Sequence, residues 1–273
     1  LTLSSGCKEI KDNNSESAYA IAKSFSRGLL MGARGNSGVI TSQIFRGFAE
    51  GLIDKEEVSV EELSEAFENG VQVAYKAVVK PVEGTILTVI REASALLAEQ
   101  VKPTMSLEKA FDILIKEAKA SLERTPNLLP VLKKAGVIDS GGAGLVKILE
   151  GMKSSLIGKD IDRTLNSAFG QESSIHAAGA DLEEEEFGYC TEFIMELGPD
   201  SVKKPFNESE FTKNLSGLGN SLVVVRDEEI VKVHVHTMSP GEALNYAQQF
   251  GEFLKLKIEN MTEQHHALVS GSD

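Results

Sequence analysis

The sequence is poor in the features that mark secreted, membrane-spanning and nucleic-acid-binding proteins. Only two of its 273 residues are cysteines, Cys7 and Cys190, and this usage predicts a cytoplasmic chain with thiol groups rather than a disulfide scaffold. It contains no secretory signal pattern and no apolar run near the roughly 18 residues of a membrane-spanning helix. Lysine and arginine are scattered, and the net charge of −13 repels nucleic acid and anionic membranes. We therefore expect no membrane span and no nucleic-acid partner.

What the sequence does contain is typical of a globular protein built in two different parts. Hydrophobic residues make up 41% and charged residues 25%, and the length suffices for one large domain or two ordinary ones. Apolar residues recur at helical spacing, which predicts an all-α domain over residues 1–157. Its helices start at caps such as Ser59 and stop before Pro81 and Pro126. The polar stretch 158–186 is predicted to be a linker.

Residues 187–273 change to the alternating pattern of strands. A strand, a helix, a hairpin that turns at residues 226–229, a second helix and a last strand follow one another. This β-α-β-β-α-β order matches the ferredoxin-like split βαβ unit. The predicted fold class is therefore multidomain α and α+β, with an all-α helical barrel or bundle followed by a ferredoxin-like domain.

A glycine-rich loop, MGARGNSGVITSQ (residues 31–43), separates two apolar helical segments. Its glycines allow positive φ angles and a close approach to a ligand, and we expect Ser37 to cap a helix that starts at Gly38 or Val39. The backbone N–H groups and the dipole at such a start can bind a phosphate, with help from the Asn36 side chain. The loop is neither a P-loop nor a GxGxxG turn after a strand. Taken alone, a tightly packed helix–helix turn is the commoner interpretation.

Two further stretches place glycine and polar residues at predicted helix starts. KPVEGTILTVI does so at Gly84 and Thr85, and GVIDSGGAGLV does so at Asp139, Ser140 and Gly141. Three such starts exceed what packing alone requires, and in an up-and-down helical domain they could converge at one end. The alternative for each is ordinary N-capping, above all for Asp139.

The second part of the chain contains a candidate zinc site. His234 and His236 stand two residues apart in a predicted strand, so their side chains share one face. Cys190 lies in the first strand, which pairs with the third, histidine-bearing strand in a ferredoxin-like sheet. The alternative is that the histidines are ordinary polar residues and that the cysteine belongs to the core. If zinc is bound, the fourth ligand would be water or one of Glu192, His265 and His266.

Four stretches together carry a family resemblance. They are LLMGARGNSGVITSQIFRGF, KPVEGTILTV, ERTPNLLPVLKKAGVIDSGGAGL and VKVHVHT, in this order. With them the chain resembles the fatty acid kinase A family of bacteria over nearly its whole length. The nucleotide domain of that family is related to the L subunit of dihydroxyacetone kinase.

The resemblance implies an activity, cofactors, a partner and site residues. The helical domain should bind ATP and Mg²⁺ at one end of its barrel and phosphorylate a fatty acid carboxylate. A separate fatty-acid-binding protein should present the acid, and the acyl phosphate should serve phospholipid synthesis. The middle domain should carry Zn²⁺ at Cys190, His234 and His236, in a structural or dimer-organising role. The residues that the resemblance assigns to ATP binding are Gly35, Asn36, Ser37, Gly38, Thr85, Asp139, Ser140 and Gly141.

One part of the family pattern is missing from the sequence. The magnesium ligands of the family are closely spaced aspartates in a loop before the segment that begins this chain, and Glu9, Asp12 and Glu16 stand in the wrong context. Phosphoryl transfer relies on Mg²⁺ to neutralise charge on the β- and γ-phosphates. We therefore expect an interior fragment that is inactive alone, with the aspartate loop upstream of Leu1 and a further domain beyond Asp273.

Two other functions remain as alternatives. In the first, the chain is a non-catalytic zinc-binding interaction module whose helical half is a docking platform. In the second, it is a dihydroxyacetone-type kinase of a small polyol, although the helical domain alone makes up the polyol kinase subunit. A sheet that can pair edge to edge, together with the resemblance, predicts a homodimer.

Overall fold

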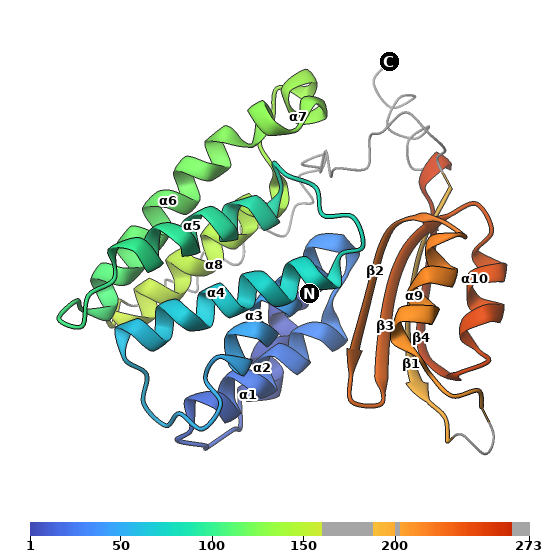
Figure 1. The fold of residues 1–273 in the computed structure, drawn as a ribbon, viewed down its shortest axis with the longest axis horizontal. Coiled ribbons are helices and arrows are strands. Elements are labelled where there is room, and N and C mark those ends of the chain that lie inside the picture. The colour runs from blue at the N-terminus through green and yellow to red at the C-terminus, as the bar shows by residue number, and fades with distance from the viewer. Residues whose placement is uncertain (160–187, 200–202, 264–273) are drawn as a thin grey trace.

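The computed structural model describes residues 1–159, 188–199 and 203–263 of the chain. In the first of these ranges the helices lie side by side as a bundle (Figure 1). The predicted linker lies almost wholly outside the described residues, so its bounds and the domain limits stay predictions. The helices of the bundle are α1 (Thr2–Ile10), α2 (Ala18–Gly32), α3 (Gly35–Glu50), α4 (Val60–Ala77), α5 (Ile86–Gln100), α6 (Leu107–Leu128), α7 (Pro130–Ala135) and α8 (Ser140–Leu156).

Side-chain caps explain where several of these helices begin. Ser17, Thr85 and Ser106 each accept a hydrogen bond from a backbone N–H in the first turn of α2, α5 and α6, respectively. At α4 the cap is reciprocal, because the side chains of Ser59 and Glu62 each accept the backbone N–H of the other residue. Apolar side chains of α3, α4, α5, α6 and α8 pack into one shared buried core.

Helix α6 continues through Pro126, whereas the sequence pattern predicts that it ends before that residue. A proline in a helix lacks the N–H that would bond to the carbonyl four residues earlier. Here the Thr125 hydroxyl donates to that carbonyl, the Leu122 oxygen, at 2.7 Å. The neighbouring side chain thus satisfies the acceptor, and α6 extends to Leu128.

Two other features of the helical domain differ from the prediction. Helix α4 ends at Ala77, because Val78 forms a β-bridge with Val223 of the sheet instead of continuing the helix. Helix α1 has no predicted counterpart, since it contacts α2 through a glycine rather than an apolar stripe. A Cβ on Gly6 would lie 2.7 Å from the Phe25 ring, so the two helices approach closely at this point.

The second part of the chain is a four-stranded antiparallel sheet with two helices on one face. The order across the sheet is β2-β3-β1-β4, with all pairings antiparallel. This is the ferredoxin-like arrangement, so the predicted fold class is confirmed. The elements are β1 (Tyr189–Leu197), α9 (Glu208–Ser216), β2 (Asn220–Asp227), β3 (Ile230–Thr237), α10 (Pro240–Ala247) and β4 (Gly251–Asn260).

The sheet lies between two layers of helices (Figure 1). Its outer face forms a buried cluster with α9 and α10. Its inner face packs on the helical domain, where Val223 and Val225 of β2 contact Leu30, Ala33 and Val39. The inner face therefore touches the end of α2, the start of α3 and the short connection between them.

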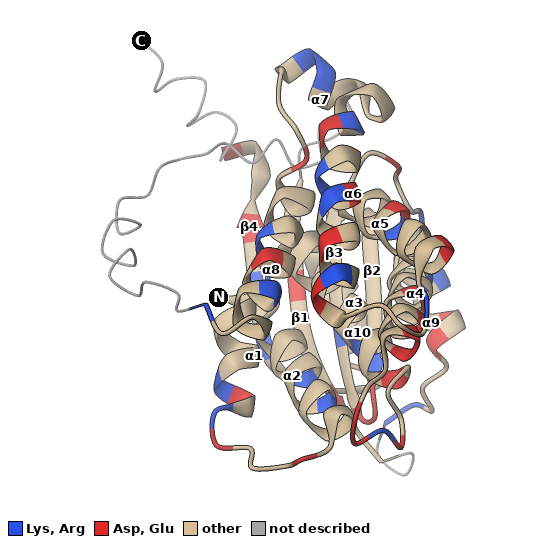
Figure 2. Ribbon diagram, turned by 90° about the vertical axis from the view of Figure 1, so that its left-hand side faces the viewer, with Lys and Arg blue, Asp and Glu red and all other residues tan. Residues whose placement is uncertain are grey.

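Positions of basic and acidic residues are interspersed along the helices in the ribbon of Figure 2. Among the described residues, no helix combines the length and the apolar character needed to cross a membrane.

Candidate functional site

The glycine-rich loop is a short extended connection between α2 and α3. Arg34 is extended, and Gly35 has a φ of +63°, in the left-handed region that favours glycine. Helix α3 begins at Gly35, so the expected start at Gly38 or Val39 is wrong. Ser37 therefore lies in the first turn and is not the N-cap. The physical reason is a remote acceptor, because a carboxylate oxygen of Glu192 in β1 accepts the Gly35 N–H at 2.8 Å.

The structure brings the three glycine-bearing helix starts together. A Cβ built on Gly141, in the first turn of α8, would lie 2.8 Å from the Ser37 Oγ and 3.4 Å from the Ile86 Cβ. Ser37 belongs to the first turn of α3, and Ile86 is the first residue of α5. The N-termini of α3, α5 and α8 thus meet at one point, and Gly141 leaves space there for the Ser37 hydroxyl.

The polar groups around this point differ in whether they have hydrogen-bond partners. The Asn36 Oδ1 is buried and has no hydrogen-bond partner within the described part of the chain. By contrast, the Thr85 hydroxyl donates to the Val82 carbonyl and accepts the Leu87 N–H. Buried polar atoms without partners are uncommon because they cost free energy, and one beside a glycine loop indicates a place for a ligand.

Asp139 ties two of the three helix starts together. It is buried, and its carboxylate accepts the Gly142 N–H as the N-cap of α8 and also a backbone N–H from Ile86 of α5. Burial raises the pKa of Asp139, and these two hydrogen bonds oppose the rise. The geometry therefore gives Asp139 a capping role, and its contact with a nucleotide stays a prediction. Ser140, next to it, is exposed to solvent.

The three residues of the predicted zinc site cluster on the inner face of the sheet. Cys190 of β1 is the register partner of His236 of β3, and Glu192 is the partner of His234. One ligand atom from each of Cys190, His234 and His236 can be chosen so that all three lie within 4.8 Å of one another. The Cys190 Sγ lies 4.0 Å from the His234 Nδ1, and the two histidine Nε2 atoms are 3.1 Å apart.

This donor set suits zinc in chemistry and in surroundings. One thiolate and two imidazoles are common zinc ligands, and three protein ligands leave one position for water or a further side chain. Both histidines are buried, and His236 also lines a hollow of about 300 Å³ at the end of the sheet. Of the candidate fourth ligands, His265 and His266 lie outside the described residues.

Glu192, the remaining candidate, stands beside the cluster and also reaches the glycine loop. Its Oε1 lies 3.4 Å from the His234 Nδ1 and 3.8 Å from the Cys190 Sγ, and the same atom accepts the Gly35 N–H. Burial by itself would raise the pKa of Glu192, but the His234 imidazole and the Gly35 N–H lower it to about 2. Glu192 is therefore a carboxylate shared between the cluster and the start of α3.

Lys232 is a second buried charge that points from the sheet into the helical domain. Its ammonium group donates to the carbonyls of Leu30 at 3.2 Å and Ala33 at 2.5 Å, at the C-terminal end of α2. Burial lowers the pKa of Lys232 to about 8, and the nearby charge of Glu192 opposes this effect. Lys232 is not among the site residues predicted from sequence, although the alternation in VKVHVH places it on the same face as His234 and His236.

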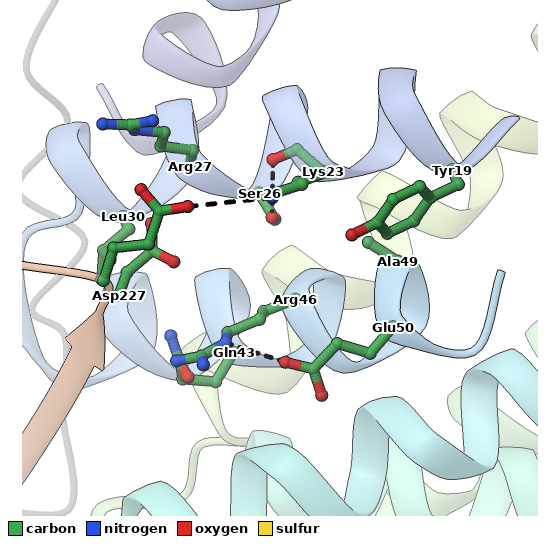
Figure 3. Close-up of a pocket in the computed structure, with 11 residues that line it drawn as sticks. Tyr19, Lys23, Ser26, Arg27, Leu30, Gln43, Arg46, Ala49, Glu50 and Asp227 are labelled. Carbon is green, nitrogen blue, oxygen red and sulfur yellow. Dashed lines mark hydrogen bonds and ion pairs between the residues drawn. The ribbon is translucent and has the colours of Figure 1, made fainter. Parts of the chain in front are cut away.

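A separate cavity of about 230 Å³ lies between α2, α3 and the turn that joins β2 to β3 (Figure 3). It is lined by charges of both signs, among which Arg46 pairs with Glu50 and Lys23 with Glu228. None of the predicted site residues lines it. Gln43, the last residue of the glycine-rich stretch, lines it, but Asn36, Ser37 and Gly38 do not, so the cavity is not assigned to the candidate nucleotide site.

Comparison with known proteins bears on both parts of the chain. Residues 1–154 match the DAK2 domain, and residues 186–268 match the fatty acid kinase A-like middle domain. The chain is 46% identical over 274 residues to an uncharacterised protein of Staphylococcus haemolyticus strain JCSC1435, with 98% of this chain and 49% of that relative covered. Uncharacterised proteins of Staphylococcus aureus strains bovine RF122 and USA300 are also 46% identical, with 98% of this chain and 50% of each relative covered.

The chain therefore spans about half the length of the curated relatives that it matches. The DAK2 match extends over more than half of the chain, from α1 to α8, and includes all three helix starts that meet at Ser37 and Gly141. The middle-domain match includes the Cys190, His234 and His236 cluster. The chain belongs to the kinase family that joins a DAK2 domain, related to the L subunit of dihydroxyacetone kinase, to a fatty acid kinase A-like middle domain.

Proposed function

We propose that the chain is the nucleotide-binding and middle part of an ATP-dependent fatty acid kinase. The observation that carries this proposal is the meeting of three helix N-termini around Ser37 and Gly141, beside the Asn36 side chain, whose amide N–H₂ group can donate to a phosphate. The positive ends of three helix dipoles directed at one place suit the phosphates of a nucleotide. Ser37 and Ser140 are exposed there, so their hydroxyls are open to a ligand from solvent.

In the proposed reaction, a carboxylate oxygen of the fatty acid attacks the γ-phosphorus of ATP. The bond from that phosphorus to the β–γ bridging oxygen breaks, ADP leaves, and an acyl phosphate forms for phospholipid synthesis. A separate fatty-acid-binding protein presents the acid. The match to the fatty acid kinase A-like middle domain supports this substrate over a small polyol.

The proposed site also needs carboxylates to hold Mg²⁺. In the family that the chain resembles, closely spaced aspartates hold this ion. Thr2 lies at the Gly38 turn, because a Cβ on Gly38 would be 2.9 Å from the Thr2 Oγ1. The first turn of α1 thus lies beside the first turn of α3. The present chain alone is then expected to lack phosphotransferase activity.

The proposal gives the sheet two roles. Cys190, His234 and His236 would hold Zn²⁺ as a structural ion, with the fourth position taken by water or another side chain. The edge strand β4 would pair with a second copy to form a homodimer. Its exposed apolar side chains support this, because an uncovered apolar edge is a ready pairing surface. These side chains are Leu254, Leu256 and Ile258.

The experiment that tests the kinase proposal uses the full-length protein with its fatty-acid-binding partner. Calorimetry measures the binding of Mg·ATP, and a radiolabelled assay measures the acyl phosphate. Asn36→Ala is expected to weaken nucleotide binding about tenfold, because the side-chain N–H₂ group, which would donate to a charged phosphate, is lost. Asn245→Ala, at an exposed position on α10, is the matched control and should bind as the wild type does.

A full-length protein that neither binds Mg·ATP nor forms acyl phosphate contradicts the proposal. In that case the non-catalytic zinc-binding module becomes the better account of the chain. Binding of Mg·ATP together with transfer to dihydroxyacetone, but not to a fatty acid, would instead support the polyol kinase.

A further inference from the structure

Two side chains of the sheet form hydrogen bonds with the two ends of the connection between α2 and α3. On its first side, Lys232 donates to the Leu30 and Ala33 carbonyls, where α2 ends. On its second side, Glu192 accepts the Gly35 N–H, where α3 begins. Both residues are almost fully buried, with exposed fractions of 3% for Lys232 and 5% for Glu192. The sheet thus contacts polar backbone groups on both sides of this connection.

The signs of the two charges match the groups that they contact. The C-terminus of a helix carries partial negative charge on its carbonyls, which suits the Lys232 ammonium, and the N-terminus carries partial positive charge on its N–H groups, which suits the Glu192 carboxylate. Hydrogen bonds of this charged kind are shorter and stronger than neutral ones. The geometry of the glycine loop is therefore set by residues of the other part of the chain.

The Glu192 contact matters most for the nucleotide site. Gly35 directly precedes Asn36 and Ser37, and its φ of +63° turns the chain into α3. A change in the Gly35 orientation would move the Asn36 amide and the Ser37 hydroxyl relative to Gly141. The Oε1 of Glu192 is also the atom that lies near the Cys190 Sγ and the His234 Nδ1.

We propose that Glu192 and Lys232 are positioning residues of the nucleotide site, and that Glu192 couples the Cys190, His234 and His236 cluster to the glycine loop. The inference rests on the proposed function, since it assigns these residues to the loop that would hold the phosphates. A cation at the cluster competes with the Gly35 N–H for the Glu192 Oε1. Occupancy of the cluster therefore loosens the bond that holds the start of α3.

The first test measures hydrogen exchange of single amides by NMR in this chain, without nucleotide or metal. Glu192→Ala removes the acceptor, and exchange at Gly35 is expected to become about tenfold faster or more. Exchange at Gly142, whose N–H is bonded to Asp139, should stay unchanged and serves as the internal reference. Glu192→Gln keeps an acceptor oxygen and should restore most of the protection.

Two further variants complete this test. Glu196→Ala, at an exposed position of the same strand, should leave Gly35 exchange as in the wild type. Lys232→Met, which leaves Glu192 in place, should accelerate exchange at Gly35 by a smaller factor than Glu192→Ala does. Equal exchange at Gly35 in Glu192→Ala and the wild type overturns the positioning role. Equal acceleration at Gly35 and Gly142 overturns it too, because it shows general destabilisation only.

The second test adds ZnCl₂ to the metal-free chain. Zinc is expected to accelerate exchange at Gly35 in the wild type and to have no effect on Gly35 in Glu192→Ala. The double variant His234→Ala with His236→Ala should bind no zinc and show no response. The coupling is overturned if the wild type binds no zinc, or if bound zinc leaves the exchange rate at Gly35 unchanged.

The third test measures Mg·ATP affinity in the full-length protein with the cluster free of zinc. Glu192→Ala is expected to lower the affinity while its metal-free thermal midpoint stays close to that of Glu192→Gln. If the wild type binds no nucleotide, the proposed function fails, whereas the exchange measurements still decide whether Glu192 holds the loop. If the wild type binds nucleotide and Glu192→Ala binds it equally well, the positioning role fails and the kinase proposal stands.

Discussion

Helices α3 and α8 begin in contact with each other, yet their first turns are stabilised in opposite ways. The start of α8 is capped by its own residue, since Asp139 accepts the N–H of Gly142 three positions later. The start of α3 is capped from another part of the chain, because Gly35 is bonded to Glu192, 157 positions away. A local cap needs only a helix, whereas a remote cap exists only while the sheet is docked. One side of the candidate nucleotide site is therefore autonomous, and the other depends on the neighbouring domain.

Removal of the local cap is expected to have the largest effect on stability. Asp139→Ala leaves the buried N–H groups of Gly142 and Ile86 without their acceptor. The free energy of unfolding should fall by about 2 to 3 kcal/mol, measured by urea denaturation followed by circular dichroism. A loss below about 0.5 kcal/mol, the usual range of surface changes, would show that the cap contributes little.

Asp139→Asn is the matched control, because its amide oxygen can still accept a hydrogen bond. Burial raises the pKa of Asp139 above its ordinary value of 3.8, so the folded protein holds a proton there more tightly than the unfolded chain does. The wild type should therefore lose stability relative to Asp139→Asn as the pH rises from 3.8 through the raised pKa. A difference between the two proteins that stays constant with pH, or that changes in the opposite direction, contradicts this assignment.

An intermediate loss of stability is expected at the start of α3, which Glu192 caps from the sheet. Gly35→Ala introduces no clash, since no described atom lies within 4 Å of the added Cβ. The cost is instead the left-handed backbone, about 1 to 2 kcal/mol for a residue with a side chain. The control is Gly144→Ala in the interior of α8, where φ is ordinary and space is open, so that stability should rise slightly. Equal stability of the two variants would show that Gly35 changes its conformation freely.

The smallest loss of stability is expected at Ser37 and Gly141, where the starts of α3 and α8 touch. Gly141→Ala places a Cβ 2.8 Å from the Ser37 Oγ, which must shift, and the unfolding free energy should fall by about 1 kcal/mol. Ser37→Ala removes the hydroxyl and should abolish this loss in the double variant, which chemical denaturation of the four proteins of the cycle can measure. Additive losses would mean that the two residues do not compete for the same space.

The same contrast explains which parts of the molecule could be predicted from sequence. The reciprocal cap of Ser59 and Glu62 and the cap at Thr85 depend on residues within one helical turn, so local patterns reveal them. The Cys190, His234 and His236 cluster could be predicted because strand periodicity and strand order together place the three side chains on one face. In each case the pattern itself contains the partner.

Residues whose partners lie far along the chain could not be found in this way. Nothing near Gly35 indicates that Glu192 caps α3, and nothing near Lys232 indicates that its acceptors are the carbonyls at the end of α2. The expected N-cap role of Ser37 was wrong for this reason, since local reasoning assigns the nearest hydroxyl. The extension of α6 past Pro126 depends on the orientation of the Thr125 hydroxyl. No periodicity in the sequence indicates that orientation.

The bridge between Val78 and Val223 has a consequence for how the chain folds. It joins the residue after α4 to the edge strand β2, and the Val79 N–H adds a hydrogen bond to the Leu222 carbonyl. Contacts between residues so far apart in sequence form late, because a long loop must close before they stabilise anything. We expect the bundle and the sheet to fold together in one cooperative step. Until that step occurs, the edge of β2 stays uncovered and open to aggregation.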